Sequence, residues 1–340
     1  MYPPWFPLCS WIFPTNVNQI LLVATKPFRL VKAIDNLYSK KPPISEDKLL
    51  KKVTTIILAL SLSHAASTQE LGAEAYEVLM STFSYDTGYP LNARVVGKAE
   101  LDGLTFERIV FDSFHGGAVP GLLAIPTSGE KLHPLVLLLH GLTDDKSAWL
   151  KSESMHGGEV TKGLLAAGYA VMMLDAQYHG DRAVYNDYID PGEMIFRHFW
   201  GARYSNMLTQ SIVDYRRAID YLGTRDEIDL NRIGIIGYSM GGHMTFLLAA
   251  SEPRVKTIVS CVVPETPGML TAASTFVRSL ENKPLLMMMA QKDQFYTVEF
   301  AQQLFDSVPG DSKSLRFFDS GHSLPIEYTA QVVEWVDENL

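Results

Sequence analysis

The sequence is poor in cysteine. Its 340 residues contain two, Cys9 and Cys261, far apart along the chain. A single pair cannot build the disulfide framework that stabilises small secreted domains. No Cys/His spacing typical of zinc occurs, and His156, His179 and His198 share no regular metal-ligand spacing. We therefore expect no metal and no cofactor.

The chain also lacks an excess of basic residues. Lys and Arg number 29 against 38 Asp and Glu, which gives a formal net charge of −9. Because a negative chain repels the phosphate backbone, nucleic-acid binding is not expected. With 47% hydrophobic and 20% charged residues, the composition is that of a globular protein with a sizeable core.

No apolar run is long enough to span a membrane comfortably. The nearest case is residues 48–66, where basic residues precede a short apolar stretch at 53–62 and then small residues. This order is typical of a secretory signal peptide, cut near Ala65 or Ala66. Residues 1–47 hold seven of the 18 prolines and are interpreted as an irregular extension. The protein is then secreted or periplasmic; the alternative is a buried helix in a cytoplasmic protein.

From residue 67 onwards, strand and helix patterns alternate. A helix is predicted over 68–82, followed by two antiparallel strands at 106–114 and 119–125. Further strands are predicted at 134–139, 169–174, around 233, and at 255–263, 285–290 and 315–318, with helices at 160–167, 206–222, 242–250, 298–308 and 325–340. We predict an α/β domain over 67–340, with a mostly parallel sheet of about eight strands and helices on both faces.

A Gly-x-Ser-x-Gly motif spans residues 237–241. An apolar strand at 232–236 leads into it, and a predicted helix follows. This context gives the motif its meaning, because a sharp strand–helix turn presents the hydroxyl of Ser239 clear of the backbone. The two glycines let strand and helix approach closely, and the helix N-terminus supplies free N–H groups. The motif therefore predicts that Ser239 is a nucleophile.

A serine nucleophile needs a base, and the base needs an acid that orients it. In a parallel sheet such groups lie beyond the carboxyl ends of the strands. Asp293 and His322 each follow a predicted strand downstream of Ser239. The order nucleophile, acid, base is the one found in α/β-hydrolases. Glu265 is the competing acid, whereas Asp319 is too near the histidine along the chain.

Attack on a carbonyl creates an oxyanion, which needs two fixed hydrogen-bond donors. We predict the backbone N–H of Met240, at the head of the helix, and that of Leu142, in the loop after the first parallel strand. The N–H of Thr143 is the second choice for the loop donor. Gly141 allows this loop to bend beneath the site. Since only backbone groups donate, the side chains can be apolar and help to line an acyl pocket.

These motifs resemble those of the α/β-hydrolase superfamily of esterases and lipases, over about residues 106–340. The resemblance is carried by His140-Gly141, Gly237-Tyr238-Ser239-Met240-Gly241, Asp293 and Gly321-His322. Residues 115–126 further resemble the entry hairpin of the branch containing dienelactone hydrolases, acetyl esterases and prolyl-oligopeptidase-like enzymes. Dienelactone hydrolases proper use a cysteine nucleophile, where this chain has Ser239. The resemblance implies a two-step acyl transfer through an acyl-enzyme, without a cofactor.

The leading hypothesis is a carboxylic-ester hydrolase for small-molecule esters with short to medium acyl chains. Insertions at 175–205 and 264–282 are short, so a partial cap is expected over the site rather than a large lid. The candidate substrate-binding residues are Thr143, Tyr178, Phe199 and Trp200. The stretch 193–204 is equally compatible with a helix packed on the core.

Three other functions stay open at this point. The first is a serine peptidase of the prolyl-oligopeptidase-like type. The second is an acetyl-esterase that acts on carbohydrate esters. The third is a binding protein on a catalytically dead hydrolase fold, which predicts that one of the three catalytic side chains is missing or out of place.

Overall fold

The computed structural model describes residues 71–101, 103–127, 131–153 and 155–340. The interpretations of residues 1–47 and of the signal-peptide-like segment 48–66 fall outside these ranges and stay predictions. Within the described ranges, no helix combines the length and the apolar character needed to cross a membrane.

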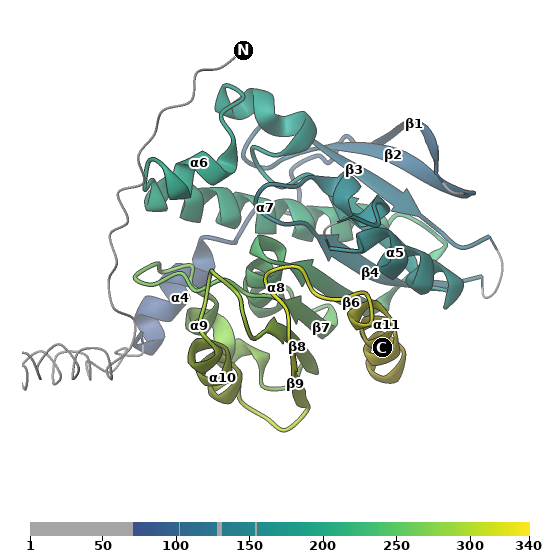
Figure 1. Cartoon of the computed structure of the whole chain (residues 1–340). Helices are drawn as coiled ribbons and strands as arrows, with labels where there is room; N and C mark the ends of the chain where they lie inside the picture. Colours follow the sequence, from purple (N-terminus) through teal and green to yellow (C-terminus); the bar gives the residue numbers. More distant parts are fainter. Residues whose placement is uncertain (1–70, 102, 128–130, 154) are drawn as a thin grey trace, which may run out of the picture. The chain divides into compact units, whose positions relative to one another are not determined.

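Nine strands form one mixed sheet in the described part of the chain (Figure 1). From one edge to the other they are β1 (Arg94–Leu101), β2 (Leu104–Asp112), β3 (Ala118–Ala124), β5 (Ala170–Leu174), β4 (His133–Leu139), β6 (Ile228–Tyr238), β7 (Val255–Cys261), β8 (Leu285–Ala290) and β9 (Lys313–Phe318). The pairings from β1 to β5 are antiparallel, and those from β5 to β9 are parallel. The carboxyl ends of the parallel strands therefore share one edge, where reactive groups gather in such folds.

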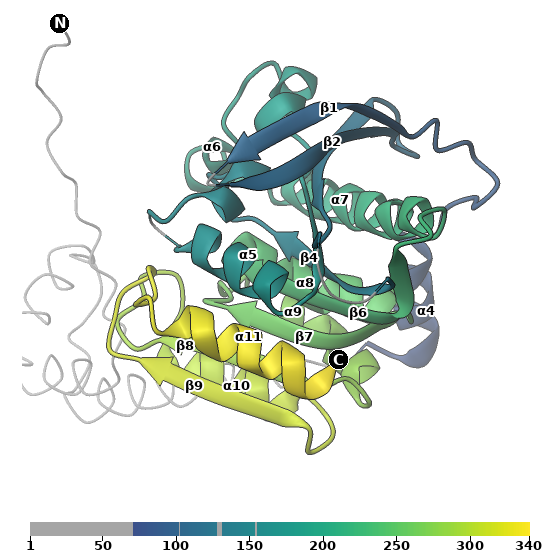
Figure 2. The same ribbon diagram turned by 90° about the vertical axis from the view of Figure 1, so that its right-hand side faces the viewer.

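Helices cover both faces of this sheet. Their bounds are α4 (Ala73–Ser81), α5 (Gly157–Ala166), α6 (Pro191–Phe196), α7 (Gly201–Leu222), α8 (Met240–Ser251), α9 (Ala273–Phe276), α10 (Val298–Ser307) and α11 (Tyr328–Asn339), with short 3₁₀ turns η1 (Lys146–Leu150), η2 (Gly180–Asn186) and η3 (Val277–Leu280). Helices α5 and α11 pack together on one face (Figure 2), and α7, α8, α9 and α10 follow one another on the other. The predicted α/β-hydrolase architecture is confirmed.

The central strands are buried as their apolar sequences predict. Every residue of β4, β5 and β8 is buried, because helices pack against both faces of the parallel part of the sheet. Helix α8 is buried along almost its whole length as well. The segment that carries the Gly-x-Ser-x-Gly motif therefore runs through the middle of the core.

The strand β1 was not predicted by the sequence pattern. It lies at the edge of the sheet, pairs with β2 alone and keeps most of its residues exposed. Its register also shifts between Val95 and Gly97. A strand without a buried face leaves no periodic apolar signal, so the sheet has nine strands where the sequence predicted about eight. Helix α7 likewise begins at Gly201 rather than at residue 206, inside the segment interpreted as an insertion.

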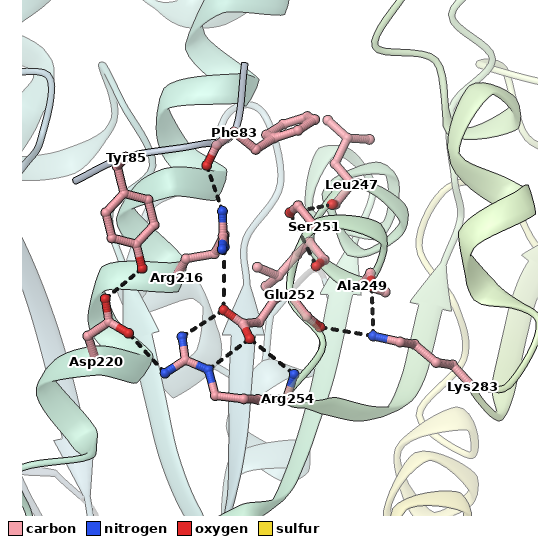
Figure 3. Close-up of polar contacts among 11 residues, drawn as sticks. Phe83, Tyr85, Arg216, Asp220, Leu247, Ala249, Ser251, Glu252, Arg254 and Lys283 are labelled. Carbon is pink, nitrogen blue, oxygen red and sulfur yellow. Dashed lines mark hydrogen bonds and ion pairs between the residues drawn. The ribbon is translucent and has the colours of Figure 1, made fainter. Parts of the chain in front are cut away.

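A buried ion network ties the end of α8 to α7 (Figure 3). Glu252, which directly follows α8 and has a side chain that is 1% exposed, pairs with Arg216 at 3.4 Å and with Arg254 at 2.7 Å. Arg254 also pairs with Asp220 of α7 at 2.9 Å. Burial alone would raise the pKa of Glu252, but the hydrogen bonds from Arg254 outweigh it and hold the pKa below its usual value. The carboxylate is therefore charged and fully paired at neutral pH.

Lys283 completes this anchor from the segment before β8 (Figure 3). Its ammonium group donates to the carbonyl oxygens of Ala249 and Glu252, at 2.7 and 2.9 Å. These carbonyls lie at the negative end of the helix dipole, where a cation is favourable. Helix α8 is thus fixed at its far end, which also fixes the direction of its first turn beside Ser239.

Candidate active site

Ser239 stands at the turn between β6 and α8. Its φ of 56° and ψ of −116° lie in a region that residues other than glycine rarely adopt. The Ser239 N–H donates a 2.9 Å hydrogen bond to the carbonyl oxygen of Cys261, which holds the turn against β7. Backbone strain at a single residue that the surrounding structure over-determines is characteristic of functional sites.

The glycines of the motif are required by close backbone contacts. A β-carbon added at Gly237 would lie 2.1 Å from the carbonyl oxygen of Gly241. One added at Gly241 would lie 2.0 Å from the carbonyl oxygen of Leu139 on β4. Both distances are far below van der Waals contact, so the strand–turn–helix path is open to glycine alone at these positions.

Three side chains that are far apart in sequence meet at the carboxyl edge of the sheet. His322 Nε2 lies 2.8 Å from Ser239 Oγ, and His322 Nδ1 lies 2.8 Å from Asp293 Oδ2. Because a carboxylate can only accept, Nδ1 carries the proton and donates to Asp293. Nε2 is then the acceptor for the serine hydroxyl. The arrangement can remove a proton from Ser239 and stabilise the imidazolium that results.

Asp293 forms the buried end of this arrangement. Its side chain is 0% exposed, and its Oδ1 accepts the Phe295 N–H at 2.9 Å. Burial alone would raise the pKa of Asp293, but the hydrogen bonds from His322 and Phe295 outweigh burial and hold the pKa below its usual value. The carboxyl group is therefore ionised at neutral pH.

The two other acids considered from the sequence lie elsewhere. Glu265 is exposed, and its backbone N–H rather than its side chain contacts the Asp293 loop, through the Phe295 carbonyl oxygen at 3.1 Å. Asp319 has a 72% exposed side chain and pairs with Lys292 at 2.6 Å. Neither carboxylate has a hydrogen bond to His322 among the described residues.

Tyr238 supports the loop that carries the histidine, a role that the sequence analysis missed. Its hydroxyl donates to the His322 carbonyl oxygen at 2.8 Å and accepts the Leu324 N–H at 2.9 Å. The phenol is buried, and its ring lies edge-on to the imidazole. The residue before the serine is a variable position of the motif, so no sequence signal pointed to this contact.

The predicted oxyanion donors lie on fixed backbone. His140 is buried, and its Nε2 accepts the Ala176 N–H at 3.0 Å, so its Nδ1–H donates to the Gly141 carbonyl oxygen at 2.8 Å. The C=O and N–H of a trans peptide point in opposite directions, so this bond also fixes the Leu142 N–H. Burial lowers the pKa of His140 to about 4 and keeps the neutral form that this pattern requires. Met240 is the first residue of α8, so its N–H has no acceptor within the helix.

His179 lies beside the next peptide of the same loop. Its two ring nitrogens lie 2.9 and 2.8 Å from the carbonyl oxygens of Gln177 and Leu142, and the ring packs on His140 with ring centres 4.9 Å apart. Burial lowers the pKa of His179 to about 4, so the neutral ring has one N–H and donates to one of these two carbonyls. The loop after β4 therefore packs against a pair of buried histidines.

The three aromatic candidates for substrate binding contact Arg203 or solvent. Tyr178 and Trp200 both pack against the guanidinium of Arg203, with 5.4 and 5.3 Å to the ring centres. Phe199 is 84% exposed. Among the described residues, none of these three aromatic side chains has a hydrogen bond or ring contact with the catalytic candidates.

Two other aromatic residues lie beside the histidine. The ring of Phe295 packs edge-on against His322, with centres 4.7 Å apart, and Phe196 from α6 lies 5.8 Å from Phe295. Helix α6 also passes close to the oxyanion loop, since a β-carbon added at Gly192 would lie 3.5 Å from Thr143 Cγ2. The segment after β5 therefore reaches the site through α6. An exposed aromatic residue in an insertion gives no sequence signal for which ring will face the site.

Neither Cys261 nor a cluster of potential metal ligands forms a second reactive site among the described residues. Burial raises the pKa of the Cys261 thiol well above its usual value, so the thiol stays protonated. Within the described ranges, no group of three or more His, Cys, Asp or Glu side chains lies close enough together to hold a metal ion. The candidate reactive groups are therefore Ser239, His322, Asp293 and the backbone N–H groups of the loop after β4.

A mostly parallel sheet with a serine at a strained strand–helix turn, followed by an acid and a histidine after later strands, defines an α/β-hydrolase. The model of the dienelactone hydrolase family matches residues 149–323, a little over half of the chain. The chain therefore belongs to the dienelactone hydrolase family, and the resemblance found in its motifs is confirmed.

Two curated relatives match the chain over part of their length. YtaP of Bacillus subtilis (strain 168) is 27% identical over 184 residues, which are 50% of this chain and 56% of YtaP. The quorum-quenching protein AidA of Acinetobacter baumannii (strain MDR-ZJ06) is 26% identical over 177 residues, 51% of this chain and 48% of AidA. The chain thus spans about half the length of the curated relatives it matches.

Solved structures share the fold over a larger part of the chain. A cold-adapted esterase from an Arctic intertidal metagenomic library has a TM-score of 0.56 and 23% identity, and covers 72% of this chain and 98% of its own. Acetyl xylan esterase 1 from Thermoanaerobacterium sp. JW/SL YS485 has a TM-score of 0.60 and 13% identity, with 82% and 98% covered. At these identities the likeness shows a shared fold.

Proposed function

We propose that this chain is a carboxylic-ester hydrolase that works through an acyl-enzyme on Ser239. The observation that carries the proposal is the continuous hydrogen-bonded path from Ser239 Oγ through His322 to the buried carboxylate of Asp293, with 2.8 Å at both steps. A catalytically inactive hydrolase fold would not require these three side chains to stay within hydrogen-bond distance of one another. Membership of the dienelactone hydrolase family supports hydrolysis as the reaction class.

In the proposed reaction His322 Nε2 takes the Ser239 proton while Oγ attacks the ester carbonyl. The carbonyl oxygen becomes an oxyanion that the N–H groups of Leu142 and Met240 stabilise. The tetrahedral intermediate collapses, the C–O bond to the alcohol breaks, and the imidazolium gives its proton to the leaving alcohol. Water then repeats the sequence on the acyl-enzyme, releasing the acid and restoring the serine. Asp293 holds the tautomer and stabilises the imidazolium throughout.

We propose short to medium acyl chains as substrates. Helix α6 passes close to the oxyanion loop, since a β-carbon added at Gly192 would lie 3.5 Å from Thr143 Cγ2. The same helix carries Phe196, which approaches the Phe295 ring that packs on His322. A segment that approaches both the oxyanion loop and the base suits small esters better than esters with a long acyl chain.

A series of p-nitrophenyl esters tests this proposal directly. We expect kcat/KM to be highest for the acetate and butyrate and to fall steeply for the palmitate, because α6 lies close to the oxyanion loop and limits the space for a long chain. An alanyl-prolyl p-nitroanilide and acetylated xylan, assayed alongside, separate the peptidase and carbohydrate-esterase alternatives. Faster cleavage of the anilide than of the butyrate would contradict the esterase proposal, and a maximum at palmitate would contradict the chain-length part.

Asp293→Asn is expected to lower kcat by about 10³–10⁴-fold with a small change in KM. The amide can donate to His322 Nδ1, which favours the tautomer that cannot accept the Ser239 proton. Asp319→Asn is the matched control. Asp319 precedes His322 by three residues and pairs with Lys292 on the surface, so the substitution removes a carboxylate that is close in sequence to the histidine. Steady-state kinetics on p-nitrophenyl butyrate measure both variants; an unaffected Asp293→Asn enzyme would show that another acid orients the histidine.

A further inference from the structure

Asp144 is an unpaired carboxylate next to the proposed nucleophile. Its backbone N–H donates to the Gly141 carbonyl oxygen at 3.3 Å, which closes a tight turn in the oxyanion loop. The Asp144 side chain lies beside Gly141. A β-carbon added at Gly141 would be 2.9 Å from Asp144 Oδ2 and 3.8 Å from Ser239 Cβ. One carboxylate oxygen and the nucleophile's side chain thus border the same small volume.

The carboxylates around Asp144 all have partners, whereas Asp144 has none. Asp145 accepts the Ser147 N–H at 2.7 Å, and Asp175 pairs with Lys146 at 2.7 Å. Among the described residues, the Asp144 side chain has no hydrogen bond and no ion pair, although it is partly buried. The Asp144 carboxylate can therefore accept a hydrogen bond from water or from a bound substrate.

The charged groups that act on Asp144 are Asp145, Lys151, His179 and His322. Burial raises the pKa of Asp144, Asp145 adds to this, and Lys151 and the two histidines oppose it. In the proposed reaction the group beside His322 is the leaving alcohol, because the imidazolium gives its proton to that oxygen. An alcohol part held between Ser239 and His322 is then close enough to feel the charge of Asp144.

We propose that Asp144 selects the alcohol part of the substrate, favouring an alcohol with a hydroxyl donor near the ester and rejecting one with a carboxylate there. This inference rests on the proposed ester hydrolysis at Ser239. A hydroxyl can donate to the unpaired carboxylate, which supplies the missing partner. An anionic group is repelled across a short distance in a partly dehydrated site, where charges interact more strongly than in water. The residue acts on specificity, and the bond-breaking chemistry stays with Ser239 and His322.

Three acetate esters of matched size test this directly: ethyl acetate, 2-hydroxyethyl acetate and acetoxyacetate. Their alcohol parts end in a methyl, a hydroxyl and a carboxylate group. We expect the wild-type kcat/KM for acetoxyacetate to be at least about tenfold below that for ethyl acetate, and that for 2-hydroxyethyl acetate to equal or exceed it. Asp144→Asn keeps the side-chain size and removes the charge. It should raise the ratio of acetoxyacetate to ethyl acetate by about tenfold.

The matched control is Asp306→Asn, which removes the same charge from the exposed face of α10, where Asp306 accepts from Gln302. It should leave the ratio unchanged. An Asp144→Asn enzyme with an unchanged ratio overturns the proposal, because a structural role alone does not sense the substrate's charge. If that variant does not fold, the wild-type ratio decides. It should rise several-fold between about 0.01 and 1 M salt, as the screening length falls from about 30 to about 3 Å, and a constant ratio overturns the proposal.

Failure of the underlying reaction has a different signature. If Ser239 is not the nucleophile, hydrolysis of all three esters is either absent or equally fast in Ser239→Ala. If Asp144 alone is misassigned, the esters are hydrolysed in a Ser239-dependent way, with a charge ratio that Asp144→Asn does not change.

Discussion

Replacing Ser239 with alanine is expected to lower kcat for p-nitrophenyl butyrate by about 10⁴–10⁶-fold. The reason is that Ser239 Oγ is the hydroxyl hydrogen-bonded to His322 Nε2, so its loss removes the group that the base activates. The fold should be unaffected, since the strained turn is held by its glycines and by the bond to Cys261. Steady-state kinetics and circular dichroism measure the two properties separately.

The control for this substitution is Ser81→Ala. Ser81 lies at the end of α4, where its exposed hydroxyl bonds only to the Val78 carbonyl oxygen. The Ser81→Ala substitution removes one serine hydroxyl, as Ser239→Ala does, and should leave kcat within twofold of the wild type. If Ser239→Ala retained more than a tenth of the wild-type rate, the nucleophile would have to be sought elsewhere.

Gly241→Ala is expected to lower the free energy of unfolding by about 3 kcal/mol or more. The added β-carbon would lie 2.0 Å from the carbonyl oxygen of Leu139 and 2.8 Å from that of His140. Both belong to the central strand β4 and its loop, which helices and neighbouring strands hold on all sides. Relieving the clash would move α8 away from β4. Urea denaturation followed by fluorescence measures the loss.

Gly97→Ala supplies the comparison for the clash. A β-carbon there, on the exposed edge strand β1, would meet only the Arg108 side chain at 4.0 Å. We expect a change within about 0.5 kcal/mol, as for surface substitutions in general. Equal stabilities of the two variants would mean that the strand–helix contact at the nucleophile is looser than the backbone positions indicate.

The catalytic candidates could be predicted from sequence because each one leaves a local signal. The turn glycines flank Ser239 in a fixed pattern. Asp293 follows the buried apolar strand β8, and His322 follows the half-buried strand β9. The parallel sheet then places the ends of such strands along one edge. Fold and triad geometry follow from patterns of this kind, which depend on few long-range details.

The surroundings of the site could not be predicted in the same way. Tyr238 supports the histidine loop, and Phe295 packs on His322, through contacts between segments far apart in sequence. Phe199 was a predicted substrate-binding residue, and Phe196 lies in the same stretch, 193–204. In the structure Phe196 packs beside Phe295, the ring next to His322, whereas Phe199 is 84% exposed. Positive φ values at Tyr178 and Phe199 turn the segment in ways that side-chain patterns do not encode.

The edge strand β1 was missed for a related reason. With most of its residues exposed, it carries no apolar alternation that distinguishes it from a loop. Its existence depends on the open edge of β2, to which it pairs along its whole length. Pairing partners of this kind are a property of the folded sheet and not of the strand's own sequence.

The most direct measurement is covalent labelling with a fluorophosphonate, followed by peptide mass spectrometry. A serine activated by His322, next to backbone N–H groups that donate to the phosphoryl oxygen, should give one adduct per chain. The adduct should lie on the peptide that contains Ser239, and labelling should disappear in Ser239→Ala. An enzyme that hydrolyses esters yet carries the adduct on another residue, or none at all, would contradict the assignment of Ser239 as the group that forms the acyl-enzyme.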